Sequence, residues 1–154
     1  MKIPAPLFAF INPTATLLLR SPLHGFWSRN LLLITFTGRN SGRKFTTPVR
    51  YVRTGDTIRC FTSRENQWWR NLRGGAEVTL RIRGKNTDYT ATAIDNDPAK
   101  VRKWLVYYLD LFPRDAAYHN IKLNSDNTLV EADLERACHE AIVVEAQAIG
   151  ETHR

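Results

Sequence analysis

The 154-residue chain is poor in cysteine and has no long apolar run. Cys60 and Cys138 lie far apart and form no CxxC pair, which argues against a disulfide scaffold and for a reducing compartment. No apolar stretch approaches the roughly 20 residues that span a bilayer. Prolines interrupt the apolar N-terminus where a secretory signal would lie. We therefore expect a cytoplasmic protein.

Motifs of several enzyme classes are also missing. There is no GxSxG elbow, so a serine hydrolase has no support. The strict phosphate-binding patterns, GxGxxG and GxxxxGK followed by Ser or Thr, do not occur. The histidines have no metal-ligand spacing with one another or with the cysteines, so we expect no metal site: His24, His119, His139 and His153.

Acidic residues are scarce in the middle of the chain. From Gly38 to Lys85 there are twelve Lys or Arg and three Asp or Glu, a balance of +9. The whole chain has a net charge of +7, so the remainder carries −2. This concentration of positive charge predicts an anionic partner at the middle segment.

Length and composition predict one globular domain, residues 1–154, because 43% hydrophobic and 24% charged residues are ordinary values. We divide it into an N-terminal helical segment (1–30), a core of strands (31–94) and a C-terminal helix with a last strand (95–154). In residues 1–30, Asn12-Pro13 and Ser21-Pro22 predict two short helices. They pack over the sheet or a partner chain; peripheral membrane contact through residues 3–29 is the second interpretation.

The most informative stretch is LLLITFTGRNSGRKFTTPVRYV, residues 31–52. It predicts a strand, a tight basic turn and a returning strand. The two glycines of the turn allow positive φ angles and expose backbone N–H groups. Arg39, Arg43 and Lys44 crowd the same turn, and arginine suits phosphate or carboxylate oxygens. We expect an anionic ligand here; a solvated basic turn is the alternative.

Downstream, alternation and turn residues predict a small antiparallel sheet. We expect strands at 57–63, 78–83, 88–94 and 141–146, helices at 65–72, 99–112 and 129–136, and an irregular stretch at 114–128. The strand at 78–83 presents Thr79, Arg81 and Arg83 on one basic face.

Adjacent tryptophans occupy the predicted helix at 65–72. Trp68 and Trp69 point about 100° apart on a helix, so we predict that one packs inward while the other lines a pocket for a flat aromatic ligand. Burial of both in the core is the alternative. Ser63 and Asn71 are available as hydrogen-bonding partners.

TGR-x-SG, TTP and WWRNL occur here in the order and spacing of the deazaflavin-dependent nitroreductase and quinone reductase family, which the segment from about 31 to 94 resembles. The resemblance implies an α+β fold: a split β-barrel of about six mostly antiparallel strands with short N-terminal helices and one longer C-terminal helix. It implies the 8-hydroxy-5-deazaflavin coenzyme F420, with flavin mononucleotide as the alternative cofactor. A homodimer is expected by the same likeness.

The resemblance also implies a set of cofactor-binding residues: Arg39, Asn40, Ser41, Gly42, Arg43, Lys44, Pro48, Ser63, Arg64, Trp68 and Asn71. The basic turn would face the phosphate and acidic tail, Pro48 the deazaflavin ring and Trp68 its hydroxylated edge. The family often has lysine at the position of Asn40.

The implied activity is hydride transfer from the reduced coenzyme to a small-molecule electron acceptor: a quinone, an enone or a nitroaromatic compound. The coenzyme supplies the chemistry and the protein holds it. The sequence does not identify a catalytic residue; the candidates are Ser63, Tyr107, Tyr108 and Tyr118.

Two other functions are compatible with the sequence. A protein of the same fold can bind flavin mononucleotide, haem or a fatty acid. A nucleic-acid-binding β-barrel would use the basic face at 79–83 and stack bases on Trp68 or Trp69. We favour the reductase and expect no nucleic-acid partner.

Overall fold

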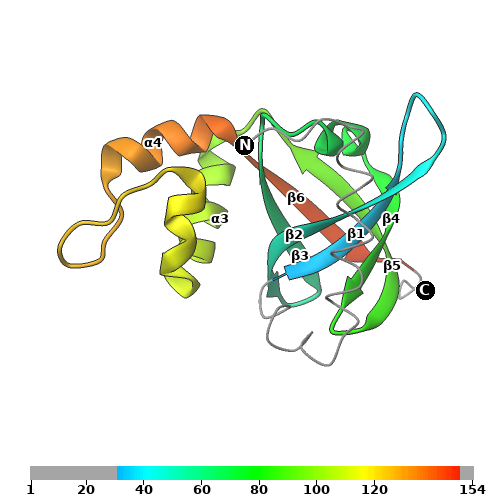
Figure 1. Cartoon of the computed structure of the whole chain (residues 1–154), viewed down its shortest axis with the longest axis horizontal. Helices are drawn as coiled ribbons and strands as arrows, with labels where there is room; N and C mark the ends of the chain where they lie inside the picture. Colours follow the sequence, from blue (N-terminus) through cyan, green and yellow to red (C-terminus); the bar gives the residue numbers. More distant parts are fainter. Residues whose placement is uncertain (1–30, 150–154) are drawn as a thin grey trace.

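Six strands close into a barrel in the part of the chain that the computed structural model describes, residues 31–149 (Figure 1). The strands are β1 (Leu31–Thr37), β2 (Lys44–Thr54), β3 (Thr57–Ser63), β4 (Ala76–Ile82), β5 (Lys85–Ile94) and β6 (Ala141–Ala148). Their order is β1-β2-β3-β6-β5-β4, and all pairs are antiparallel. This confirms the predicted barrel. The helices predicted in residues 1–30 and the membrane contact through residues 3–29 lie outside the described residues.

Side-chain alternation separates the inside of the barrel from its outside. On β2, Thr47, Val49 and Tyr51 are buried, while Pro48 and Arg50 on the opposite face are partly exposed. The interior is filled by aliphatic and aromatic residues contributed by all six strands, among them Leu32, Ile34, Tyr51, Ile58, Leu80, Tyr89 and Val144. Because this interior is packed, ligands have access to the outer face and to the two ends of the barrel.

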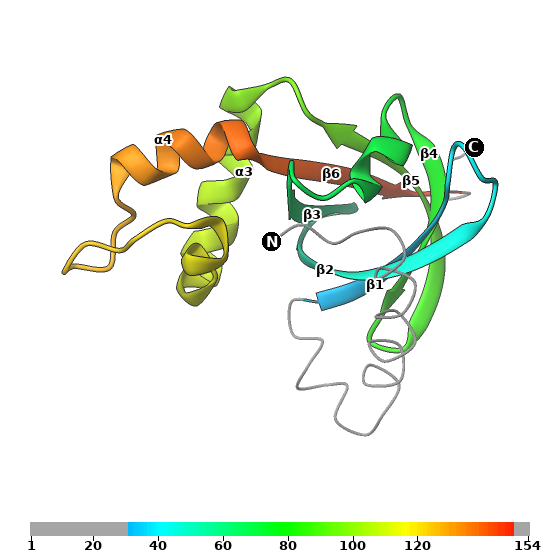
Figure 2. The same ribbon diagram turned by 45° about the horizontal axis from the view of Figure 1, so that its top comes forward.

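The two ends of the barrel differ. The short 3₁₀ helix η1 (Trp68–Leu72) lies across one end, which we call the closed end. The turns between β2 and β3 and between β4 and β5 form the other, which we call the hairpin end (Figure 2). The predicted helix at 65–72 is therefore shorter than expected, and Gly74 and Gly75, with φ of 78° and 96°, follow it.

The prediction that one tryptophan of η1 lines a pocket is wrong. Trp68 is 6% exposed and Trp69 is fully buried, and both belong to the barrel core. The Trp68 ring contacts Phe36 at a centroid distance of 5.7 Å. Both rings are interior because η1 caps a barrel end, where the strands surround it on several sides. The nucleic-acid alternative would require bases to stack on these rings, of which only 6% of Trp68 is exposed.

A helical layer packs against one outer face of the barrel (Figure 1). It consists of α3 (Pro98–Leu111), the 3₁₀ helix η2 (Pro113–His119) and α4 (Glu131–Glu140). Asp97 caps the N-terminus of α3, since its carboxylate accepts a hydrogen bond from the Lys100 backbone N–H at 3.1 Å. The layer meets the barrel where the Tyr108 ring stacks on Phe61 at 4.3 Å. No helix among residues 31–149 is long and apolar enough to cross a membrane.

The prediction of an irregular stretch at 114–128 is partly wrong. Its first residues form η2, which buries Ala116 and His119 against the second core cluster. The composition of the stretch is polar, so its sequence does not indicate the few buried positions. The helix predicted at 129–136 is present as α4, which begins two residues later and ends four residues later, at Glu140.

His119 is 8% exposed and packs edge-on between the rings of Tyr108 and Tyr118. Its Nε2 has no hydrogen-bond partner among the described residues. Burial disfavours the imidazolium and lowers the pKa of His119 to about 4. The side chain is therefore neutral at neutral pH.

We expect acid to destabilise the protein through His119. The unfolded chain takes up this proton near pH 6.5 and the folded chain only near pH 4, so stability falls as the pH drops through this window. In urea unfolding at pH 7 and pH 5, His119→Gln should reduce the loss of unfolding free energy by about 2 kcal/mol. His139→Gln, at an exposed position on α4, is the control. An unchanged pH dependence in His119→Gln would contradict this role.

Candidate functional site

The basic turn between β1 and β2 is a closed loop of main-chain hydrogen bonds. The Gly38 N–H donates to the Arg43 carbonyl at 2.8 Å, and the Gly42 N–H donates to the Gly38 carbonyl at 2.9 Å. The Arg43 N–H donates to Ser41 Oγ at 3.1 Å. A Cβ at residue 38 would lie 2.9 Å from Ser41 Oγ and 3.0 Å from the Phe45 ring, so glycine is needed there for close packing.

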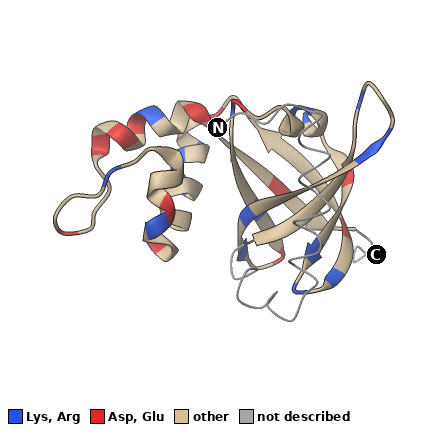
Figure 3. Ribbon diagram, in the orientation of Figure 1, with Lys and Arg blue, Asp and Glu red and all other residues tan. Residues whose placement is uncertain are grey.

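The positive charge of this loop is not neutralised by ion pairs with the described residues. Arg39, Arg43 and Lys44 are exposed, and no acid of residues 31–149 forms an ion pair with them. The Arg43 guanidinium lies over the Phe45 ring at 5.9 Å. Figure 3 shows Lys and Arg at this loop and on the barrel, with many of the acids on the helical layer. The turn therefore suits a phosphate or carboxylate ligand.

Asn71 connects the basic turn to η1. Its Oδ1 accepts a hydrogen bond from the Arg39 N–H at 2.9 Å, and its Nδ2 donates to the Trp68 carbonyl at 2.9 Å. The structure thus connects Arg39 with Asn71, which is 32 positions away in sequence, and with Trp68 on the same 3₁₀ helix as Asn71. It uses Asn71 as a brace for the turn. Coenzyme contacts of Trp68 and Asn71 remain predictions.

Two further predicted residues share the outer face of the barrel. Arg50 of β2 pairs with Phe61 of β3, and strand alternation puts Pro48 on the same face as Arg50 and Ser63 on the same face as Phe61. Both are partly exposed. Pro48 lies four residues from Lys44, about 13 Å along the strand. The outer face of β2 therefore connects the basic turn with the edge of the helical layer.

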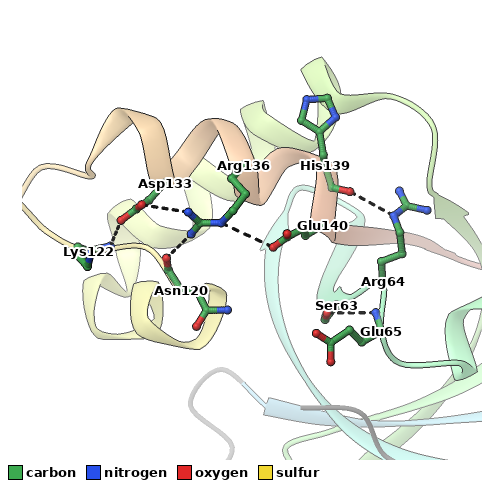
Figure 4. Close-up of polar contacts among 9 residues, drawn as sticks. All are labelled: Ser63, Arg64, Glu65, Asn120, Lys122, Asp133, Arg136, His139 and Glu140. Carbon is green, nitrogen blue, oxygen red and sulfur yellow. Dashed lines mark hydrogen bonds and ion pairs between the residues drawn. The ribbon is translucent and has the colours of Figure 1, made fainter.

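A pocket of about 580 Å³ lies beside Ser63, between the barrel and the helical layer. We call it the interlayer pocket. Its lining comes from the end of β3, from η2 and from the junction of α4 with β6: Ser63, Arg64, Glu65, Asn66, Ala117, Tyr118, His119, Asn120, Ala137, Glu140 and Ala141. Figure 4 shows Ser63 and Glu65 on the barrel side and Asn120 and Glu140 on the helical side.

Arg64 holds the two sides of this pocket together. Its Nε donates to the His139 carbonyl at 3.2 Å (Figure 4). Its Nη2 donates to the Asp95 carbonyl at 2.7 Å. On the helical side, Arg136 donates to the Asn120 carbonyl at 2.5 Å and pairs with Asp133 at 3.2 Å. These contacts fix the width of the pocket. The predicted phosphate contact of Arg64 stays a prediction.

The structure separates the candidates for a catalytic hydroxyl. Ser63 and Tyr118 line the interlayer pocket, and Tyr118 is 59% exposed. Tyr108 is buried and donates to Asp115 Oδ2 at 2.5 Å, and burial together with this bond raises its pKa. Tyr107 is exposed and lies edge-on to the Trp104 ring at 5.6 Å. Neither Tyr107 nor Tyr108 is among the residues that line the pocket.

Sequence reasoning missed several pocket residues. His119 and Asn120 come from a stretch predicted to be irregular, and Glu140 lies between a predicted helix and a predicted strand, so nothing in their local pattern indicates a pocket. Arg50 could have been found, since strand alternation puts it on the same face as Pro48. Its guanidinium lies 5.4 Å over the Tyr118 ring and 3.5 Å from Asp115. Within residues 31–149 no three His, Cys, Asp or Glu side chains gather as a metal site.

Comparison with solved structures supports the fold. One neighbour, described as a domain-swapped dimer, is 18% identical with a TM-score of 0.50, over 91% of this chain and 99% of that one. A protein of unknown function from Agrobacterium tumefaciens is 14% identical with a TM-score of 0.53, over 86% of this chain and 57% of the other. An F420-H2-dependent reductase, FDR-A, is 20% identical with a TM-score of 0.49, over 75% and 94%.

Sequence comparison defines the family. No curated protein matches the chain. The family model described as F420H(2)-dependent quinone reductase matches residues 22–130, which include the basic turn, Ser63, η1 and Tyr118. The chain belongs to the F420H(2)-dependent quinone reductase family, a family of oxidoreductases that use coenzyme F420.

Proposed function

We propose that this protein transfers a hydride from F420H2 to a planar, electron-poor acceptor, a quinone, an enone or a nitroaromatic compound. The observation that carries the proposal is a basic turn whose cations have no acidic partner among residues 31–149, joined by β2 to the interlayer pocket through the contact of Arg50 with Tyr118. When bound, the reduced coenzyme supplies the hydride. A quinone that receives it also takes up one proton and leaves as the hydroquinone.

The basic turn fits the charged part of the coenzyme. Arg39, Arg43 and Lys44 are exposed and have no acidic partner among the described residues, so their charge is available to phosphate and carboxylate groups. Asn71 holds the Arg39 backbone in place through the 2.9 Å hydrogen bond to its N–H. A turn held in this way loses little conformational freedom when it binds.

The outer face beside Pro48 and Ser63 fits a flat ring. Both residues are partly exposed, and neither is charged, so they can contact a ring face without opposing its charge. We assign the acceptor to the interlayer pocket, because Ser63 also lines that pocket. The Arg64 hydrogen bonds to Asp95 and His139 keep the pocket walls at a set distance, which favours the approach of about 3–3.5 Å that reacting atoms require.

Tyr118 and Ser63 are the hydroxyl groups that we assign to the acceptor. Tyr118 lines the interlayer pocket, is exposed, and lies under the Arg50 guanidinium at 5.4 Å. His119 is not assigned this role, because its pKa of about 4 leaves it neutral at neutral pH.

Two finer points complete the proposal. A homodimer is supported by the fold likeness to a structure described as a domain-swapped dimer. A cytoplasmic location rests on the sequence features set out above. Flavin mononucleotide is the alternative cofactor, and it would use the same turn for its phosphate.

The first prediction concerns coenzyme binding. Arg39→Ala should weaken oxidised F420 binding about 10- to 100-fold, because it removes a charge-assisted hydrogen bond of about 1.5–3 kcal/mol. Titration followed by absorbance and tryptophan fluorescence measures the dissociation constant, with flavin mononucleotide run in parallel. Lys103→Gln, which removes the same charge from an exposed position on α3, should leave binding unchanged. Equal weakening in both variants would show that only net charge matters.

A second prediction concerns Asn40, which is exposed between Arg39 and Ser41. Asn40→Lys adds a cation to the turn, so F420 binding should tighten several-fold at low salt and less at high salt. Asn86→Lys, in the β4–β5 hairpin region, is the matched control because it makes the same change far along the chain. Unchanged affinity in Asn40→Lys would place the coenzyme tail elsewhere.

A third prediction separates the acceptor from the coenzyme. Ser63→Ala and Tyr118→Phe should each lower kcat with a quinone acceptor by about 100-fold or more, because a positioned proton-transfer group typically contributes about 100- to 10,000-fold. The F420 dissociation constant of Tyr118→Phe should stay within about threefold of the wild type. Tyr107→Phe is the control, since Tyr107 is not among the residues that line the pocket. Full activity in both pocket variants would rule out this assignment of hydroxyl groups.

A further inference from the structure

A second cavity, of about 670 Å³, lies at the hairpin end of the barrel, opposite η1. We call it the hairpin-end cavity. Its lining comes from the turn between β2 and β3, the turn between β4 and β5, and the end of β6: Arg53, Asp56, Leu80, Ile82, Arg83, Lys85, Thr87, Tyr89, Gln147 and Ala148. It shares no lining residue with the interlayer pocket or the basic turn. The cavity is therefore separate from the proposed coenzyme site.

Positive charge dominates the rim of this cavity. Arg53, Arg83 and Lys85 line it together with a single acid, Asp56. No carboxylate among residues 31–149 forms an ion pair with any of the three cations.

Two arginines elsewhere in the protein have carboxylate partners. Arg59 pairs with Glu145 at 2.8 Å, and Arg73 pairs with Asp95 at 3.0 Å. The charge at the hairpin end is thus left without compensation, and an anion is the natural counterpart.

Both arginines lie close to tyrosine hydroxyls. Arg53 Nη2 donates to the Tyr89 hydroxyl at 3.4 Å. Burial raises the pKa of Tyr51, and the adjacent Arg83 guanidinium opposes this rise. Each guanidinium has five N–H groups, so most of them remain available to a ligand.

The backbone of Arg83 is strained. The β4–β5 turn consists of Arg83 and Gly84 between the paired residues Ile82 and Lys85, and both turn residues have positive φ, 51° and 82°. Such a turn favours Asn, Asp or Gly at its first position, where a long side chain costs stability. Residues held in an unfavourable backbone conformation concentrate at functional sites. Here the strained position places a cation on the cavity rim.

The inner wall of the cavity is apolar. Leu80 is fully buried and Tyr89 is 4% exposed, and Ile82 and Ala148 are half-buried beside them. A cavity of this volume is in the range of small-molecule sites. An apolar wall below a cationic rim suits a molecule with both an apolar body and an anionic group.

We propose that the hairpin-end cavity is a second ligand site, which binds a small amphipathic anion: a phosphate or carboxylate on an apolar body. Arg53, Arg83 and Lys85 hold the anionic group, and Leu80, Ile82 and Ala148 contact the apolar body. This site does not depend on the proposed reductase function.

The probes are octyl phosphate, octanoate and 1-octanol, each titrated into the full-length protein by calorimetry. Octyl phosphate or octanoate should bind with a stoichiometry of one, and 1-octanol at least tenfold more weakly, because it lacks the anionic group. The two anions distinguish a phosphate ligand from a carboxylate ligand. Binding should weaken as salt is raised. Absence of binding by both anions at 1 mM, or equal binding of 1-octanol, would overturn the proposal.

Arg83→Asn is the main variant, because asparagine fits the left-handed turn better than arginine. It should bind the anionic probe at least tenfold more weakly while its Tm stays equal to that of the wild type or rises. An unchanged or higher Tm would show that Arg83→Asn is folded, so that its weaker binding is caused by the lost guanidinium. Lys103→Gln makes the same change in net charge on α3 and should bind normally.

Arg39→Ala distinguishes this site from the coenzyme loop. Octyl phosphate binding should survive Arg39→Ala and should not be displaced by F420. Displacement by F420, or equal binding by Arg83→Asn and the wild type, would place the anion at the basic turn and refute the hairpin-end site. Failure of F420 to bind the wild type would count against the proposed function alone.

Discussion

Closure of one barrel end by two buried tryptophans is the constraint on which the site depends. Trp69 is fully buried, and the guanidinium groups of Arg64, Arg70 and Arg73 lie 5.7, 5.5 and 4.9 Å from its ring. These cations cover the indole on the side that faces water, and each gains a cation–π contact. The 3₁₀ helix η1, which carries both tryptophans, must be rigid, because Asn71 connects it to the basic turn and Arg64 connects it to the edge of the interlayer pocket.

Hydrogen bonds of Asn71 and Arg64, near the two ends of η1, fix the neighbouring parts of the site relative to this helix. Asn71 follows the tryptophans on η1 and braces the basic turn through the Arg39 backbone. Arg64 precedes η1 and reaches the carbonyl groups of Asp95 and His139. One short helix thus sets the position of a turn on one side of it and of the interlayer pocket on the other. The site consists of exposed cations and hydroxyl groups whose positions are set by the buried helix η1.

The charged groups of the barrel fall into two sets. On the outer face, Arg59 pairs with Glu145 and stacks 3.5 Å over the Trp104 ring, so its charge joins the helical layer to the barrel. At the basic turn and the hairpin end, arginines and lysines have no acidic partner among residues 31–149. Paired cations hold the two layers together, and the cations that remain give each end of the barrel a positive potential.

The sequence by itself determined the strands, the turns and the family. The strand β3 is found at Thr57–Ser63, as predicted. Its bounds could be predicted because side-chain alternation and turn residues are visible within a few consecutive positions of the sequence. The basic turn was also visible, since its glycines and cations are adjacent. Tertiary structure alone decided the burial of Trp68 and Trp69, the fixing of Arg64 by distant carbonyl groups and the lining of both cavities. These features arise where segments far apart in sequence meet, and local periodicity carries no information about which segments those are.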